Sequence, residues 1–311
     1  MRAWIIVAVL FWSAACVAWA QEEAQPGRPA TLVIYYTNDD WGFLDPCNCG
    51  DRSEGGLARR AALLAELRAQ DEAEGKSVLV VDAGNVLSRT EPSNVARHRT
   101  ILSLMKKMRY DALNLGYLEL DQPLSVLEPM FEGNSIALVS SNLSGGNLAL
   151  QPYVLKATPD LTIGVLGIAS TSSPPPPLGR LSIGDPFASA QAAAEALRAA
   201  GAQLIIALVS STFVDPDQFL AQLPPTVDVV IGLQARHSLT EPTQVAGKVL
   251  AVCRPYGLDL GRLELTLDPS ANPVVQAFGG EVYPLVLSLP EDPVVAALVE
   301  QLRAQEKSPA Q

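Results

Sequence analysis

Histidine is nearly absent from this chain, which has only His98 and His237 among its 311 residues. Because imidazole is the commonest metal ligand in proteins, this scarcity excludes a metal centre built on several histidines. Positive charge is also sparse, with 22 lysines and arginines against 33 acidic residues and a formal net charge of −11 at pH 7. Binding to nucleic acid needs clustered lysine and arginine, and the chain has no basic stripe. The composition therefore argues against a nucleic-acid-binding protein.

Long apolar runs are missing except near the N-terminus. Arg2 is the only charged side chain before an apolar run from Trp4 to Val17, and Ala18-Trp19-Ala20 supplies a small-residue cleavage site. This run is shorter than the roughly 20 apolar residues that span a bilayer. We therefore predict a signal peptide over residues 1–20 and a periplasmic or extracellular protein. The alternative is a lipid anchor at Cys16, because the residues before it resemble a lipobox that lacks its leucine.

The rest of the chain reads as one α/β domain. After a polar linker over residues 21–30, short apolar runs typical of strands alternate with helical runs. The predicted strands are Leu32–Tyr36, Val78–Val81, Ala112–Leu115, Ile136–Val139, Tyr153–Lys156, Thr162–Ala169, Leu204–Val209, Val227–Ile231, Val249–Cys253 and Leu263–Leu267. We expect a single domain over residues 31–290 and a C-terminal helix with a polar tail over residues 291–311.

Polar motifs follow five of these strands, at the strand ends where α/β folds place their sites. The motifs are Thr37-Asn38-Asp39-Asp40-Trp41-Gly42, Asp82-Ala83-Gly84-Asn85, Asn114-Leu115-Gly116-Tyr117-Leu118-Glu119-Leu120-Asp121, Leu208-Val209-Ser210 and Gly232-Leu233-Gln234-Ala235-Arg236. In this order they resemble the T-N-D-x-H-G, D-A-G-D, N-x-G-N-H-E-x-D, strand-terminal His and G-G-H-x-H motifs of the 5′-nucleotidase branch of the calcineurin-like metallophosphoesterases. The resemblance covers about residues 31–287. It implies a four-layer α/β/β/α sandwich with a two-metal site at the strand ends.

Most of the metal ligands that the resemblance implies are replaced in this sequence. Asp39 is kept, and Leu118 stands where the family has its catalytic histidine. The family's other ligands (His, Asp, Asn and three further His) are replaced by Trp41, Asn85, Tyr117, Ser210, Gln234 and Arg236.

These replacements remove both ligand atoms and charge. Trp41 and Leu118 have no atom able to bind a metal, and the guanidinium of Arg236 has no lone pair to donate. Asn85 cannot supply the negative charge that bridges two divalent ions. We therefore expect no cofactor at the family site, with Asp39 and Asn85 as vestigial metal positions.

We expect side chains to fill the emptied site. In this hypothesis Arg236 pairs with Asp39 or Glu119, because a lone buried carboxylate is costly. The aromatic and leucine side chains of the motifs occupy the remaining volume. The alternative for Asp39 is a loop-capping carboxylate with no partner of note.

Ordinary surface roles are predicted for the other candidate residues. His98 lies in a charged helical run beside two arginines, and His237 lies in a loop, so both are expected to be solvated. Arg59 and Arg60 are expected on a solvated or salt-bridged face at the start of a helix.

The segment Pro46-Cys47-Asn48-Cys49-Gly50 carries the most distinctive remaining chemistry. Its two thiols, one residue apart, could bind a soft metal such as Cu(I) or Zn(II), or close a strained and reducible disulfide. The alternative is a structural disulfide from Cys47 or Cys49 to Cys253. Some exported proteins that resemble 5′-nucleotidases have a similar segment, including ones with degraded metal motifs.

The sequence favours a non-catalytic exported protein, a pseudo-phosphoesterase that binds an unidentified protein or small molecule. Full-length 5′-nucleotidases have a second, substrate-binding domain after a linking helix. This chain ends near such a helix, which weakens a nucleotidase assignment. One alternative is a phosphoester hydrolase with a reduced metal site. A second is a periplasmic thiol-redox or soft-metal protein that acts through Cys47 and Cys49.

Overall fold

The computed structural model describes residues 29–49, 52–88, 95–133, 135–169, 180–210, 215–233, 239–272 and 274–307. The predicted signal peptide, Cys16 and most of the predicted linker lie outside these ranges. In the described ranges, no helix has the length and apolar character needed to cross a membrane.

The first sheet has seven strands in the order β17-β16-β1-β4-β5-β6-β8. Five are parallel: β1 (Ala30–Thr37), β4 (Ser77–Asp82), β5 (Ala112–Asn114), β6 (Ala137–Val139) and β8 (Leu150–Gln151). Two long antiparallel strands complete one edge, namely β16 (Asp259–Leu267) and β17 (Val275–Pro284). The buried aliphatic runs predicted as strands account for the parallel centre of this sheet.

The second sheet has six strands in the order β14-β15-β13-β12-β10-β9. Its parallel centre consists of β10 (Thr162–Ala169), β12 (Leu204–Ser210), β13 (Val229–Gly232) and β15 (Lys248–Ala251). Its antiparallel edges are β9 (Tyr153–Ala157) and β14 (Thr243–Val245). The predicted strands at residues 153–156 and 162–169 pair with each other as an antiparallel hairpin.

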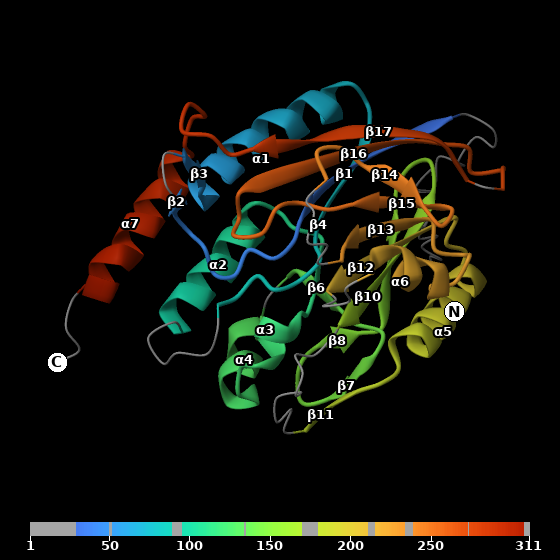
Figure 1. The fold of residues 1–311 in the computed structure, drawn as a ribbon, viewed down its shortest axis with the longest axis horizontal. Helices are drawn as coiled ribbons and strands as arrows, with labels where there is room; N and C mark the ends of the chain where they lie inside the picture. The colour runs from blue at the N-terminus through green and yellow to red at the C-terminus, as the bar shows by residue number, and fades with distance from the viewer. Residues whose placement is uncertain are drawn as a thin grey trace, which may run out of the picture.

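Helices cover the outer face of each sheet, and the two sheets pack against each other (Figure 1). The first sheet is covered by α1 (Leu57–Ala73), α2 (Val95–Lys107), α4 (Leu124–Phe131) and α7 (Pro293–Lys307). The second sheet is covered by α5 (Pro186–Ala199) and α6 (Pro216–Gln222). The predicted four-layer α/β/β/α sandwich is confirmed, and the C-terminal helix α7 contributes Val295, Val299 and Leu302 to the same core.

Several short elements were not predicted from the sequence, among them β8, β14 and α6. Between β1 and α1 the chain forms a hairpin of β2 (Pro46–Cys49) and β3 (Arg52–Gly55). A one-turn helix, α3 (Tyr117–Leu120), follows β5. A second small sheet pairs β7 (Leu143–Gly145) with β11 (Leu181–Ile183).

The parallel strands of both sheets bring their carboxyl ends to one edge of the sandwich. In the first sheet Thr37 pairs with Asp82, and in the second Ala169 pairs with Ser210. Contacts between β12 and β5 place the two rows of strand ends next to each other. The polar motifs that follow these strands therefore meet in space.

Candidate functional site at the carboxyl ends of the strands

Two loops at this edge have an unusual backbone conformation. The φ values of Asp39, Trp41 and Asn85 are 55°, 53° and 59°. Residues other than glycine seldom adopt this left-handed backbone conformation. Backbone hydrogen bonds hold the loops together: Asp39 N–H donates to Gly84 O at 3.0 Å, Trp41 N–H to Asn85 O at 2.8 Å and Gly42 N–H to Val86 O at 3.0 Å. Such strain persists only where the surroundings impose it, and it is common at functional sites.

The Asn85 side chain lies at the centre of the strand ends. Its Nδ2 donates to Asp39 Oδ1 at 2.7 Å and to Ser210 Oγ at 3.1 Å, and its Oδ1 accepts from Leu118 N–H at 3.1 Å. Asp39, Asn85 and Ser210 are all buried. The structure thus brings together three of the residues predicted at the vestigial site, with neutral groups around the one carboxylate.

Asp39 is held by amides among the described residues. Its second carboxylate oxygen accepts from Asn38 Nδ2 at 3.1 Å. Asn38 is itself clamped to the backbone of Cys253, donating to its carbonyl at 3.1 Å and accepting from its N–H at 2.8 Å. Burial raises the pKa of Asp39, and the bonds from Asn85 and Asn38 oppose that rise. Gln234 and Arg236 lie outside the described residues, so the predicted pairing with Arg236 stays a prediction.

Glu119 is a structural cap. It is fully buried and accepts three backbone N–H bonds, from Asn85 at 2.9 Å, Leu87 at 2.8 Å and Gly116 at 2.7 Å. Burial raises the pKa of Glu119, and these backbone bonds oppose the rise. Among the described residues, the carboxylate is therefore compensated by backbone N–H groups, two from the loop after β4 and one from the residue before α3.

Aromatic rings border the Asn85 cluster. Trp41 packs edge-to-face against Tyr117 and Tyr256, with ring centroids 6.2 and 5.3 Å apart, and Tyr256 packs in the same way on Phe43 at 5.3 Å. Tyr117 and Leu118 are buried. The hypothesis that large side chains fill this edge is consistent with their positions. Tyr256 was missed as a site residue, although it lies in the loop that follows β15.

Of the two alternatives predicted for Arg59 and Arg60, the salt-bridged one is confirmed and the solvated one is wrong. Arg60 is fully buried and forms a bidentate ion pair with Asp40. Its two Nη atoms donate to the two carboxylate oxygens at 2.5 and 2.7 Å. Arg59 is also buried and pairs with the half-exposed Glu291 at 3.0 Å. Burial of Arg60 joins the first turn of α1 to the loop that carries Asp39.

The prediction that His98 is solvated is wrong. Its side chain is 1% exposed, and its Nε2 accepts from Ser88 N–H at 3.2 Å and lies 2.7 Å from Ser88 Oγ. Burial, with a smaller contribution from the charge of Arg97, lowers the pKa of His98 to about 4. Because α2 packs on the first sheet, a histidine between two arginines faces the core while its neighbours face outward. His237 lies outside the described residues.

The cysteine predictions are settled in part. Cys253 is a free, buried thiol, so the structural disulfide from Cys253 to Cys47 or Cys49 is not formed. Burial raises the pKa of Cys253 and makes this thiol a poor nucleophile. Cys47 and Cys49 lie in strand β2, opposite Glu54 and Arg52.

The residues described at this edge do not fit a pair of divalent cations. Asn85 turns an N–H donor toward Asp39, where a shared metal would require lone pairs from both side chains. Trp41 and Leu118 contribute no ligand atom. In the ranges that the structure covers, no group of three or more His, Cys, Asp or Glu side chains is placed to hold a metal ion.

Comparison with known proteins gives a consistent set of relatives, although no family model matches the chain. A snake venom 5′-nucleotidase from Naja atra is 28% identical over 310 residues, covering 88% of this chain and 57% of the relative. The 5′-nucleotidase of Homo sapiens is 27% identical over 307 residues, covering 88% of this chain and 52% of the relative. The chain thus spans about half the length of these curated relatives.

Solved structures share the fold. A 5′-nucleotidase precursor from Thermus thermophilus superposes with a TM-score of 0.73 at 23% identity, covering 88% of this chain and 59% of the other. The calcineurin-like phosphoesterase YfkN from Bacillus subtilis superposes with a TM-score of 0.71 at 20% identity, covering 90% of this chain and 98% of the other. The sandwich described above is therefore similar to the phosphoesterase fold of these proteins.

Proposed function

Since the chain belongs to the 5′-nucleotidase-type, calcineurin-like metallophosphoesterase family, we propose that it is an exported binding protein that uses this scaffold without metal-dependent catalysis. The Asn85 amide supports this proposal most directly. It donates to Asp39 and Ser210 at 2.7 and 3.1 Å, at the place where the family motifs require metal ligands. An uncharged donor there opposes the binding of a cation.

The rest of the site supports the same proposal. In-line attack on a phosphate ester by metal-bound water needs two cations about 3.5–4 Å apart, or a substitute for them. Among the described site residues, Glu119 is occupied by three backbone N–H groups and Trp41 packs against aromatic rings. The proposed role is to bind a protein or a small molecule at a surface of this scaffold.

Export is part of the proposal. The N-terminal sequence has the features of a signal peptide, or of a lipid anchor at Cys16. The relatives include snake venom proteins and a protein described as a precursor. Both observations favour a location outside the cytoplasm.

A phosphatase assay with metal analysis tests this function. We expect hydrolysis of p-nitrophenyl phosphate and of AMP to stay at the uncatalysed rate with manganese, and elemental analysis to find far less than one equivalent of bound metal. The rival function is hydrolysis at a reduced, single-metal site on Asp39. Manganese-dependent hydrolysis that Asp39→Ala abolishes would establish that rival and overturn our proposal.

A thiol-based function is the second candidate, favoured by the placement of the two cysteines. Cys47 and Cys49 share β2, which pairs with β3 in a two-stranded hairpin. Residues two apart in a strand have Cα atoms about 6.7 Å apart, near the upper limit for a disulfide. Because Cys253 is free and buried, this geometry favours two reduced thiols that bind a soft metal such as Cu(I) or Zn(II).

Thiol titration separates this candidate from an inert hairpin. We expect Cys47 and Cys49 to react with Ellman's reagent in the native protein without prior reduction, and added Cu(I) to protect both from the reagent. Cys253 should react only after unfolding, because it is buried. Cys47→Ser serves as the control that removes protection of the remaining thiol. Native thiols that react equally with and without Cu(I) would remove the support for a metal role.

A further inference from the structure

The orientation of the Asn85 amide follows from its neighbours. Leu118 N–H can only donate, and it lies 3.1 Å from one side-chain atom of Asn85, which must therefore be the oxygen. The nitrogen then faces the other way, toward Asp39 Oδ1 at 2.7 Å and Ser210 Oγ at 3.1 Å. The partly positive N–H groups thus attract a carboxylate oxygen and a hydroxyl oxygen, which a cation placed between those oxygens would also do.

This cluster is complete and closely packed. Asn85 is 1% exposed, and both its amide nitrogen and its amide oxygen have partners. A Cβ atom added at Gly116 would lie 2.2 Å from Asn85 Oδ1 and 2.6 Å from Ser210 Oγ. The residue before α3 is therefore packed too closely against the cluster to have a side chain. A buried polar network with every member satisfied specifies one arrangement of the elements that carry it.

The cluster joins segments that are far apart in the sequence. Asp39 follows β1, Asn85 follows β4, Leu118 lies in α3 and Ser210 ends β12. It therefore connects the carboxyl ends of both sheets. An ordinary surface hydrogen bond could not do this, because these segments meet only in the interior.

We propose that the Asn85 amide is a built-in, uncharged substitute for a divalent cation, holding the strand ends of the two sheets together without metal. This inference rests on the proposed loss of metal-dependent catalysis. It adds that the Asn85 amide took the place of the metal. It predicts that one atom decides whether the protein needs a cation. A carboxylate in place of the amide would face Asp39 at hydrogen-bond distance. Two such carboxylates are compatible only if they share a proton or bind a cation between them.

The test is thermal unfolding of Asn85→Asp beside the unsubstituted protein, near neutral pH, with a chelator or with millimolar manganese. We expect the unsubstituted protein to have the same Tm in both. In chelator, Asn85→Asp should unfold about 5–10 °C lower, because two buried carboxylates at this distance either repel each other or must take up a proton near neutral pH. Manganese, which accepts oxygen ligands, should restore most of that loss, and elemental analysis should find bound manganese only in the variant.

Two controls make the result specific. The exchanged variant Asp39→Asn/Asn85→Asp restores one amide and one carboxylate, so its Tm should again be independent of manganese. Asn272→Asp adds the same charge at an exposed position and should leave the manganese response unchanged. If Asn85→Asp fails to fold in chelator, the refolding yield with and without manganese replaces the Tm as the readout.

Two outcomes would overturn the inference. One is an unsubstituted protein that manganese stabilises by several degrees. The other is an Asn85→Asp variant whose Tm or refolding yield ignores manganese. Neither result measures hydrolysis, so the phosphatase assay still decides the proposed function separately. An inactive protein with a manganese-insensitive Asn85→Asp variant would sink this inference alone.

Discussion

Replacing Arg60 by methionine is expected to lower the free energy of unfolding by about 3–5 kcal/mol. Arg60 is fully buried, and its guanidinium donates two bonds to Asp40, which is 2% exposed. The substitution leaves the Asp40 carboxylate without its counter-ion in the interior, where a lone charge is far less stable than in water. Urea denaturation followed by circular dichroism measures the loss.

Matched variants separate this charge effect from a packing effect. Arg60→Met/Asp40→Asn removes both charges and should recover much of the lost stability, because no uncompensated ion remains. Arg59→Met, one position earlier in α1, breaks a pair with the half-exposed Glu291 and a hydrogen bond to Gly55 O but leaves no buried charge behind, so it should cost less, about 1–2 kcal/mol. Equal losses for Arg59→Met and Arg60→Met would mean that burial of the Arg60–Asp40 pair is not what stabilises the loop.

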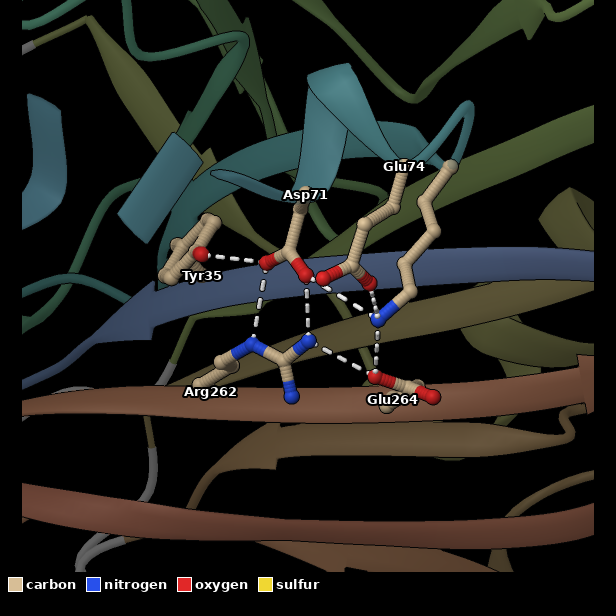
Figure 2. A network of polar contacts seen from close by, with 6 residues as sticks. Tyr35, Asp71, Glu74, Arg262 and Glu264 are labelled. Atoms are coloured by element: carbon tan, nitrogen blue, oxygen red, sulfur yellow. Dashed lines mark hydrogen bonds and ion pairs between the residues drawn. The ribbon is translucent and has the colours of Figure 1, made fainter. Parts of the chain in front are cut away.

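Replacing Asp71 by asparagine is expected to cost about 2–4 kcal/mol at neutral pH. Asp71 lies near the end of α1 over the first sheet, where Figure 2 shows it between Tyr35 and Arg262. It accepts from Tyr35 OH at 2.5 Å, from Arg262 at 2.5 and 3.0 Å, and from Lys76 Nζ at 3.2 Å. Asparagine keeps the shape but loses the charge and one acceptor. The neighbouring Glu72 is exposed and forms only a long ion pair with another exposed side chain. Glu72→Gln should therefore change stability by less than about 1 kcal/mol.

The cost of Asp71→Asn should depend on pH in a defined direction. Burial alone would raise the pKa of Asp71, but hydrogen bonds from Arg262, Tyr35 and Lys76 outweigh it and lower the pKa below its usual value. A carboxyl with a lowered folded-state pKa stabilises fully above the unfolded value of about 3.9, and this contribution is lost as the pH falls below it. The difference between the two proteins should stay constant from neutral pH to about pH 5 and shrink in acid. A difference that grows in acid would contradict this assignment.

The fold is shared with the phosphoesterase structures, whereas the loss of the metal site is our proposal. The order of strands and the folded core are those of the phosphoesterase relatives, with TM-scores of 0.73 and 0.71 for two solved structures. Cores tolerate many apolar exchanges as long as volume and pattern are kept. A metal site has no such tolerance, because one ligand changed to a donor or a hydrocarbon removes both charge and geometry.

Sequence reasoning found the parallel strands other than the two-residue β8, and most helices, because buried aliphatic runs and helical spacing are local signals. It missed β17, where Gln276, Gly279, Gly280 and Glu281 interrupt any apolar alternation. This strand exists because its backbone pairs with β16 along nearly its whole length. Pairing with a distant partner leaves little trace in the residues of the strand itself.

The buried ionisable residues were predicted least well, for a related reason. Arg60 and His98 have the composition of surface helix positions, and both are buried. Whether a charged side chain is buried depends on a partner elsewhere in the chain, such as Asp40 for Arg60, 20 positions away. A helical pattern indicates which face is apolar, but it does not identify that partner.

The sequence by itself determined the succession of the strands along the chain and which side chains stand at their carboxyl ends. Strand-forming runs and ligand atoms are properties of individual residues. Only the tertiary structure decided which of those side chains meet. Asn85 and Ser210 are 125 positions apart and lie within a hydrogen bond of each other. Hydrogen bonds act over about 3 Å, so their pattern depends on how the two sheets pack.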